Sequence, residues 1–246
     1  MIKLFSKLFD NGKTARPVCS AVVPAAGSSR RMGGENKLFA FLDGIPVLAR
    51  TLMALNATPE IDEIVVATRE EDLVAVGDLC RDYGITKPVK IVRGGADRAA
   101  SVLAACMECR EDANYIAVHD GARPLADPEL IGRVIEYCRK TNAAAAAVPA
   151  KDTIKVVRED GCVISTPDRS TLRCVQTPQV FDAQLLRAAL QATVETGAVI
   201  TDDCSAVERL GKEVYLTDGS WENIKITTPE DMLLAEAILQ KREGRL

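Results

Sequence analysis

The chain has 246 residues, of which 47% are hydrophobic and 27% are charged, a composition typical of a globular protein with a sizeable core. Its formal net charge of −4 argues against a general nucleic-acid binder, which needs an excess of lysine and arginine to displace condensed counterions. No apolar stretch approaches the roughly 18 residues that span a bilayer, so we expect neither a nucleic acid nor a membrane as partner.

The N-terminal segment and the cysteines bear on location. Residues 1–17, MIKLFSKLFDNGKTARP, have too short an apolar region for a secretion signal, and we expect a short, mobile extension; an amphipathic start that touches a membrane or a partner is the alternative. The eight cysteines lack the rhythm of a disulfide framework, which indicates a reducing compartment and a cytoplasmic protein. Cys106 and Cys109 form a CxxC, but within a helical pattern and without a second pair, so we expect no metal or redox chemistry there.

From residue 18 onward, apolar runs typical of strands alternate with helical patterns. Strands are predicted at residues 21–24, 63–67, 89–92, 115–119 and 143–149. Apolar residues at three- and four-residue intervals predict helices at residues 46–57, 70–84, 97–110 and 127–140. Such alternation favours parallel pairing with right-handed crossovers. The predicted fold is an α/β three-layer sandwich around a mostly parallel, Rossmann-like sheet.

The pattern changes after Ala150. Residues 151–169, here called the arm, contain two short alternating runs joined by Asp160-Gly161, a strong signal for a β-hairpin. Because a two-stranded hairpin is marginally stable alone in water, the arm must pack against its own core or another subunit. Strand and helix patterns then return at residues 174–176, 182–195, 203–209, 213–219 and 229–241. We predict one domain, residues 18–246, with an inserted β-hairpin arm.

The stretch SAVVPAAGSSRRMGGENK, residues 20–37, joins a predicted strand to a loop of small and cationic residues. Backbone N–H groups can close on an anion where no Cβ stands in the way, and ligands of such sheets gather at the carboxyl ends of the strands. The stretch is neither a Walker A motif nor a GxGxxG fingerprint. Arg30, Arg31 and Lys37 suit a nucleoside triphosphate with Mg²⁺, although a cationic surface loop is the alternative. His119, the single histidine, rules out a His-rich metal site, and we expect it to be structural.

Several motifs together resemble one family. The segments AVVPAAGSSRRMGGENK, RGGADRAASV, VHDGARP, KDTIK, TPQVF, ITDDCSAVE and NIKITTPEDMLLAE occur in the order found in 2-C-methyl-D-erythritol 4-phosphate cytidylyltransferases of the non-mevalonate isoprenoid pathway. Each motif is weak alone, but their order is specific, and the resemblance runs from about Cys19 to Leu239. It implies a nucleotidyltransferase-type sheet and transfer of CMP from CTP to methylerythritol phosphate, with pyrophosphate released and Mg²⁺ required.

The resemblance also implies roles for individual residues. Arg31 and Lys37 would stabilise the transition state, while Arg169 and Lys225 would hold the acceptor phosphate for attack on the α-phosphorus. The family forms dimers, so the arm would clasp a second copy of the chain and carry Thr153 and Arg169 into the partner's site.

Softer assignments cover the rest of the expected substrate site. Small residues would lie along the nucleotide, two positions would read the base, and hydroxyls with a guanidinium would line the acceptor pocket. The expected substrate-binding residues are Pro24, Ala25, Ala26, Gly27, Gly95, Ser101, Asp120, Gly121, Arg123, Thr153, Thr177 and Thr201. Asp120 is expected near the ribose or the Mg²⁺ shell, with a helix cap or an ion pair as the alternative; Mg²⁺ would be held mainly by the CTP phosphates.

The sequence departs from the family pattern in the segment NKLF, at Ala96 in place of a frequent acidic residue, and in DGAR in place of DAAR. None of these removes a charge assigned to chemistry. Two other functions stay open: cytidylyl transfer to a pentitol phosphate such as ribitol 5-phosphate, and a nucleotide-binding protein without turnover.

Overall fold

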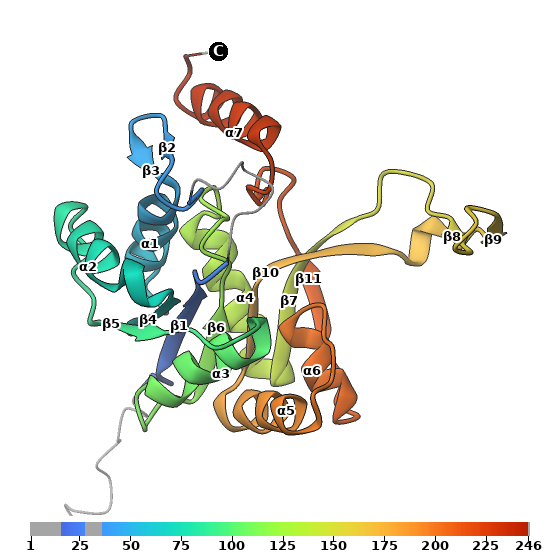
Figure 1. Ribbon diagram of the computed structural model, residues 1–246, viewed down its shortest axis with the longest axis horizontal. Coiled ribbons are helices and arrows are strands. Elements are labelled where there is room, and N and C mark those ends of the chain that lie inside the picture. Colours follow the sequence, from blue (N-terminus) through green and yellow to red (C-terminus); the bar gives the residue numbers. More distant parts are fainter. Residues whose placement is uncertain (1–15, 28–35, 246) are drawn as a thin grey trace, which may run out of the picture.

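The computed structural model describes residues 16–27 and 36–245, and a mixed β-sheet with helices on both faces lies at its centre (Figure 1). Within those residues, seven strands pair in the order β11, β7, β10, β6, β1, β4, β5. Their bounds are β1 (Cys19–Pro24), β4 (Glu63–Thr68), β5 (Val89–Arg93), β6 (Tyr115–Val118), β7 (Ala143–Pro149), β10 (Arg173–Asp182) and β11 (Tyr215–Asp218). All pairings are parallel except those of β10 with β6 and β7. The predicted mostly parallel α/β sheet is confirmed.

Two buried clusters form, one on each face of the sheet, because side chains alternate along each strand. In β1, Ala21 and Val23 belong to one cluster and Val22 to the other. The first cluster includes residues of α1 (Val47–Ala57), α2 (Leu73–Asp82), α4 (Pro128–Thr141) and α7 (Pro229–Arg242). The second includes residues of α3 (Arg98–Glu108), α5 (Ala183–Thr196) and α6 (Asp203–Arg209). Among the described helices, none combines the length and apolar character needed to cross a bilayer.

Local sequence signals explain most of the elements. β1 and β4 are mostly apolar and buried along nearly their whole length because helices cover both faces of the sheet. In α4, the Asp127 side chain accepts a hydrogen bond from the amide of Leu130, and Asn142 ends the helix in the left-handed conformation, with φ 63°. The helix predicted at residues 70–84 starts instead with a 3₁₀ turn, η2 (Glu70–Asp72), and a short hairpin of β2 (Phe41–Leu42) and β3 (Ile45–Pro46) was not predicted.

β10 is the largest difference from the predicted elements. Only residues 174–176 were predicted as a strand, whereas β10 spans Arg173–Asp182 and separates β6 from β7. Pro178 lacks the N–H that a ladder needs, and the pairing with β7 shifts register between Val175 and Gln179. Pro178 therefore makes the strand hard to predict from the sequence. The shift of register allows the strand to continue beyond Pro178.

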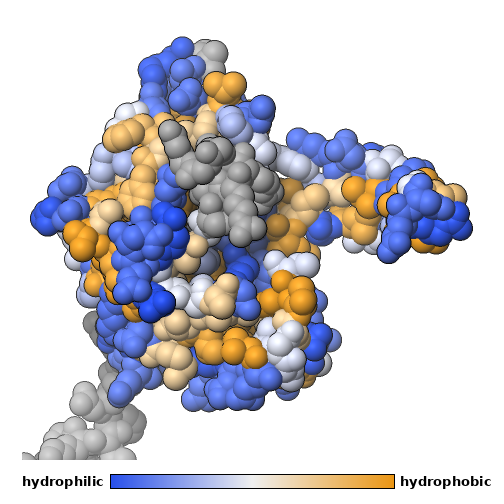
Figure 2. All heavy atoms as spheres, viewed as in Figure 1, coloured by the Kyte–Doolittle hydropathy of each residue, from blue (hydrophilic) through white to orange (hydrophobic). Residues whose placement is uncertain are grey.

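The arm extends away from the body of the molecule (Figure 1). It consists of β8 (Val156–Val157) paired with β9 (Val163–Ser165), followed by the 3₁₀ turn η3 (Arg169–Thr171). Apolar side chains lie on it without cover from the other residues that the structure describes, as the orange spheres of Figure 2 show. The exposed apolar residues of the arm are Ile154, Val156, Val157, Val163 and Ile164. A hairpin of this size with apolar side chains in water needs a further surface to pack against.

The central packing predicts how the protein responds to truncation of one side chain. Phe181 of β10 is fully buried in the second cluster. Phe181→Ala is expected to lower the free energy of unfolding by about 3–5 kcal/mol, through lost burial and the cavity left behind. Val74 of α2 is 76% exposed, and Val74→Ala, the matched control, should change it by less than about 0.5 kcal/mol. Urea unfolding followed by circular dichroism measures both; equal effects would contradict the assigned core.

Candidate active site

A pocket of about 640 Å³ opens at the carboxyl ends of the central strands. Its walls come from the loops after β1, β5 and β6, from Lys37 and Leu38, and from the segment before α7. The predicted site residues that line it are Pro24, Ala25, Ala26, Gly27, Lys37, Gly95, Ser101, Asp120, Gly121 and Lys225. Residues separated by up to 201 positions, Pro24 to Lys225, thus meet in one hollow.

The loop after β5 lies tightly against its neighbours. A Cβ on Gly94 would come within 2.7 Å of the Ala26 Cβ, and one on Gly95 within 2.4 Å of the Ala100 Cβ. The Ser101 hydroxyl accepts a hydrogen bond from the Gly95 amide at 3.1 Å and donates to the Asp97 carbonyl at 2.7 Å. Glycines therefore allow this loop to close on the β1 loop, and Ser101 holds the backbone in place.

The carboxylate of Asp120 is the electrostatic centre of the pocket. Its Oδ1 lies 2.7 Å from Nη1 of Arg98, and its Oδ2 lies 2.8 Å from Nζ of Lys225 and 3.6 Å from Nε of Arg123. An ion pair was one of the alternatives for Asp120, and the structure contains such pairs. One buried carboxylate faces three cations, so this cluster retains positive charge for an anionic ligand.

Charges shift the ionisation of this cluster. Burial alone would raise the pKa of Asp120, but Arg98 and Lys225 outweigh burial and hold that pKa well below its ordinary value. Burial lowers the pKa of Arg98, yet Asp203 and Asp120 outweigh it and raise that pKa. Arg98 reaches Asp203 Oδ2 through Nη2 at 2.8 Å. Asp120 therefore stays ionised, and Arg98 joins two carboxylates from different elements.

Lys37 lines the same pocket, although it lies far from Lys225 in the sequence. Its Nζ donates a hydrogen bond to the carbonyl of Ile226 at 2.7 Å, and Ile226 follows Lys225 in the chain. The Ile226 amide in turn donates to the carbonyl of Ala122 at 2.8 Å. Lys37 and Lys225 thus stand at one wall, attached to one backbone segment. The Lys225 side chain is 40% exposed, which leaves it accessible to a ligand.

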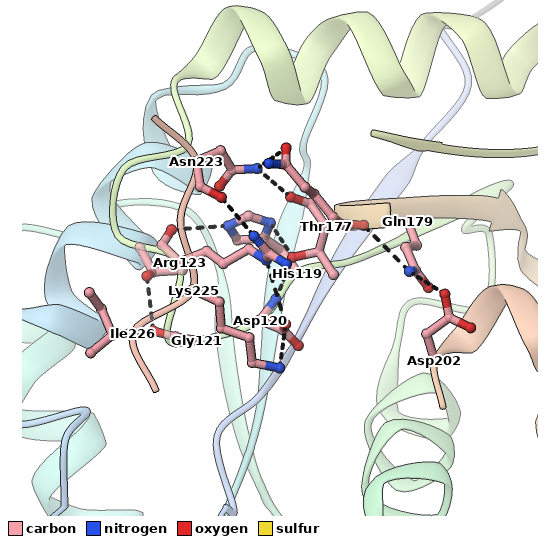
Figure 3. A network of polar contacts seen from close by, with 12 residues as sticks. His119, Asp120, Gly121, Arg123, Thr177, Gln179, Asp202, Asn223, Lys225 and Ile226 are labelled. Atoms are coloured by element: carbon pink, nitrogen blue, oxygen red, sulfur yellow. Dashed lines mark hydrogen bonds and ion pairs between the residues drawn. The ribbon is translucent and has the colours of Figure 1, made fainter. Parts of the chain in front are cut away.

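His119 and Thr177 lie beside Asp120 in one polar network (Figure 3). The Asp120 amide donates to Thr177 Oγ1 at 3.0 Å, and Thr177 Oγ1 lies 3.1 Å from His119 Nδ1. His119 Nε2 lies 3.3 Å from the Arg123 carbonyl, and the ring is fully buried. These contacts join the β6 loop to β10.

Not every predicted site residue reaches the pocket. Arg123 and Thr177 lie behind it, in contact with Asp120. Thr153 and Arg169 lie on the exposed arm, where Arg169 Nη1 donates to the Lys151 carbonyl at 2.7 Å, and Thr201 is exposed ahead of α6. Arg31 lies outside the described residues. Within one chain, then, the arm residues are not brought to the pocket.

Sequence reasoning missed a buried polar layer beneath the site. Asp203 is fully buried, and its backbone amide donates to Gln179 Oε1 at 3.0 Å, while Gln179 Nε2 donates to Asp202 Oδ2 at 2.9 Å. Asn223 Nδ2 donates to the Thr177 carbonyl at 2.9 Å, and the Asn223 carbonyl accepts from Arg123 Nη1 at 2.6 Å. The segments TPQVF, ITDDCSAVE and NIKIT contain these residues, but a sequence does not say which polar side chains face inward.

The described residues offer little for direct metal ligation. Among them, no group of three or more His, Cys, Asp or Glu side chains could hold a metal ion. Both oxygens of Asp120 already face cations. A magnesium ion bound through the phosphates of its nucleotide needs few protein ligands, and that arrangement fits this donor set.

His119 gives a prediction for pH. Burial lowers the pKa of His119 from 6.5 to about 4, despite the nearby Asp120 carboxylate. Between these values the unfolded chain binds a proton that the folded chain does not, so stability is full above pH 6.5 and falls with decreasing pH. The loss assigned to His119 is about 3 kcal/mol by pH 4.

The His119→Gln variant lacks this ionisation and serves as the reference. Urea unfolding at intervals from pH 7 to pH 4 should give a steeper decline for the wild type than for the variant. Parallel curves would contradict a buried, neutral His119.

Known proteins share this sequence and architecture. The family model of 2-C-methyl-D-erythritol 4-phosphate cytidylyltransferase matches residues 19–241. Relatives of that name are 44% identical in Bacillus cytotoxicus, over 89% of this chain and 96% of the relative, and 42% identical in Syntrophus aciditrophicus, over 94% and 100%. The crystal structure of 4-diphosphocytidyl-2C-methyl-D-erythritol synthase from Anaerococcus prevotii superposes with a TM-score of 0.83 at 32% identity, covering 91% of this chain and 99% of the other. The chain belongs to the 2-C-methyl-D-erythritol 4-phosphate cytidylyltransferase family.

Proposed function

We propose that this enzyme transfers CMP from CTP to 2-C-methyl-D-erythritol 4-phosphate, giving 4-diphosphocytidyl-2-C-methyl-D-erythritol and pyrophosphate. The observation that carries the proposal is that Lys37 and Lys225 lie at one wall of a pocket that small residues also line. Two ammonium groups and a cation-rich carboxylate cluster suit the joining of two phosphorylated substrates.

The chemistry needs positioning more than proton transfer. An oxygen of the acceptor phosphate forms a bond to the α-phosphorus of CTP, and the bond from that phosphorus to the bridging oxygen breaks, releasing pyrophosphate. Because the attacking phosphate is already ionised, no general base is required. Lys37, with Arg31, would stabilise the charge that grows at the phosphorus and the leaving group, and Lys225 would hold the acceptor phosphate.

The loops after β1 and β5 would hold the nucleotide. Ala25, Ala26 and Gly27 let a sugar and base approach the backbone, and Gly95 with Ser101 would read cytosine. Ala96 also lines the pocket, and its methyl group offers the base no polar side-chain contact. Base recognition at that position would then use backbone groups.

We also propose a requirement for Mg²⁺, held mainly by the triphosphate. Bound there, it would neutralise phosphate charge during transfer. Asp120 would act chiefly by organising Arg98, Arg123 and Lys225, since both of its oxygens face them.

The arm supports a proposed homodimer with shared sites. Its exposed valines and isoleucines need a surface that residues 16–27 and 36–245 of the same chain do not supply, and a second copy offers one. Arg169 and Thr153 would then reach the partner's acceptor pocket. All eight cysteines are free thiols, which supports a cytoplasmic location.

The proposed activity is tested by pyrophosphate release. The purified protein, given CTP and Mg²⁺, should release pyrophosphate with 2-C-methyl-D-erythritol 4-phosphate and prefer CTP over the other nucleoside triphosphates by at least about tenfold, roughly 1.4 kcal/mol. Faster release with ribitol 5-phosphate would move the assignment to pentitol phosphates. No release with any acceptor, from protein shown to bind CTP, would favour a binding protein.

The shared site is tested by mixing two variants under conditions that let subunits exchange. Lys37→Ala and Arg169→Ala should each be nearly inactive alone. In a mixed dimer of two-fold symmetry, one site collects both defects and the other neither, so random exchange of equal amounts should restore about a quarter of wild-type activity. If both residues served one site within a chain, every site would keep a defect. Absence of recovery, with exchange verified by native mass spectrometry, would then contradict the shared site.

A further inference from the structure

The single histidine of the chain lies where a small displacement would alter the whole cation cluster. His119 lies between the end of β6 at Val118 and Asp120, and its ring is fully buried. Its two nitrogens contact different groups, the Arg123 carbonyl and the Thr177 hydroxyl. The ring therefore contacts one end of the turn formed by residues 120–123 directly, at Arg123, and the other end, Asp120, through the Thr177 hydroxyl. The hydrogen bond from the Arg123 amide to the Asp120 carbonyl closes this turn at 3.0 Å.

The partners of the ring determine where its proton lies. A carbonyl oxygen can only accept, so the 3.3 Å contact with Arg123 requires the proton on Nε2. Burial keeps the ring neutral, which leaves Nδ1 with a lone pair and no proton. The Thr177 hydroxyl must then donate to Nδ1, and its oxygen accepts from the Asp120 amide. With the proton on Nε2, the hydrogen bonds run from the Asp120 amide to the Thr177 hydroxyl, from that hydroxyl to Nδ1, and from Nε2 to the Arg123 carbonyl.

We propose that His119 is a positioning residue, which, by fixing the Thr177 hydroxyl, holds the backbone of Asp120 so that its carboxylate gathers Arg98, Arg123 and Lys225 at the pocket. Thr177 comes from β10 and Asp120 follows β6, so the ring sets the relation between two strands as well as the shape of one turn. His119 itself donates no proton to substrate. Its part in turnover rests on the function proposed above.

Two substitutions separate the contacts of the ring. In His119→Asn, the amide oxygen can accept from Thr177 in place of Nδ1. In His119→Gln, the amide N–H can donate to the Arg123 carbonyl in place of Nε2, but the acceptor for Thr177 is lost. The first variant keeps the link to Asp120 and the second breaks it.

Two measurements are made on the protein alone. Because the chain has one histidine, its ¹⁵N signals need no assignment, and they should show a proton on Nε2, none on Nδ1, and no titration between pH 5.5 and pH 8. Hydrogen exchange of the Asp120 amide should be about tenfold or more faster in His119→Gln than in His119→Asn, with the Val118 amide as reference. A proton on Nδ1, titration near pH 6.5, or equal exchange in both variants would overturn the proposal.

The third measurement is turnover. For the acceptor, kcat/KM should fall about tenfold or more in His119→Gln and stay within about threefold of wild type in His119→Asn. If both variants lose melting temperature while the folded enzyme keeps its kcat/KM, His119 is structural and the positioning role is refuted. A wild type without any turnover would refute the proposed function instead, and the ¹⁵N and exchange results would still decide the link from His119 to Asp120.

Discussion

The ion pairs of Asp120 are the constraint on which the site depends. A buried carboxylate is costly unless it is paired, and here Arg98, Lys225 and Arg123 pair it from three directions. Each partner belongs to a different part of the fold: Arg98 begins α3, Arg123 closes the β6 turn, and Lys225 precedes α7. Removal of Asp120 would take away the carboxylate that these three cations share and leave Arg98 with Asp203, so one side chain joins the elements that surround the pocket.

Behind the cations lies a layer whose role is geometric. Gln179 accepts a hydrogen bond from the backbone amide of Asp203, the first residue of α6. The Asp203 carboxylate in turn accepts one from Nη2 of Arg98. Burial raises the pKa of Asp203 although Arg98 opposes it, which reflects a carboxylate kept deep in the protein by one strong partner. A continuous series of hydrogen bonds thus connects β10 to the start of α6 and then to Arg98. The buried layer thereby contacts two of the cations, Arg98 through Asp203 and Arg123 through the Asn223 carbonyl.

The sequence predicted the alternating elements, the hairpin and most pocket residues for a physical reason. Apolar periodicity, turn residues and small-residue loops are local signals, and the carboxyl ends of parallel strands necessarily share an edge. The full length of β10 was not predicted because Pro178 interrupts its apolar pattern. Its antiparallel pairing also depends on strands that are distant in the sequence. The buried positions of Asp203 and Gln179 were not predicted for a related reason. Packing decides whether a polar residue faces water or a buried partner, and packing cannot be read from one sequence.

The spread of the pocket along the chain has a consequence for how the protein is made. Lys225 and Thr227 line the pocket together with Pro24 and Ala25, so one wall is synthesised about 200 residues after another. Strands β1, β4, β5 and β6 can pair while synthesis continues, and Asp120 can pair with Arg98, but the Lys225 ammonium group reaches Asp120 only later. A nascent chain therefore passes through a stage in which these four strands are paired and the wall that contains Lys225 is absent. At that stage Asp120 has one fewer cation to balance its charge, and the order around it relies on the paired strands and on Arg98.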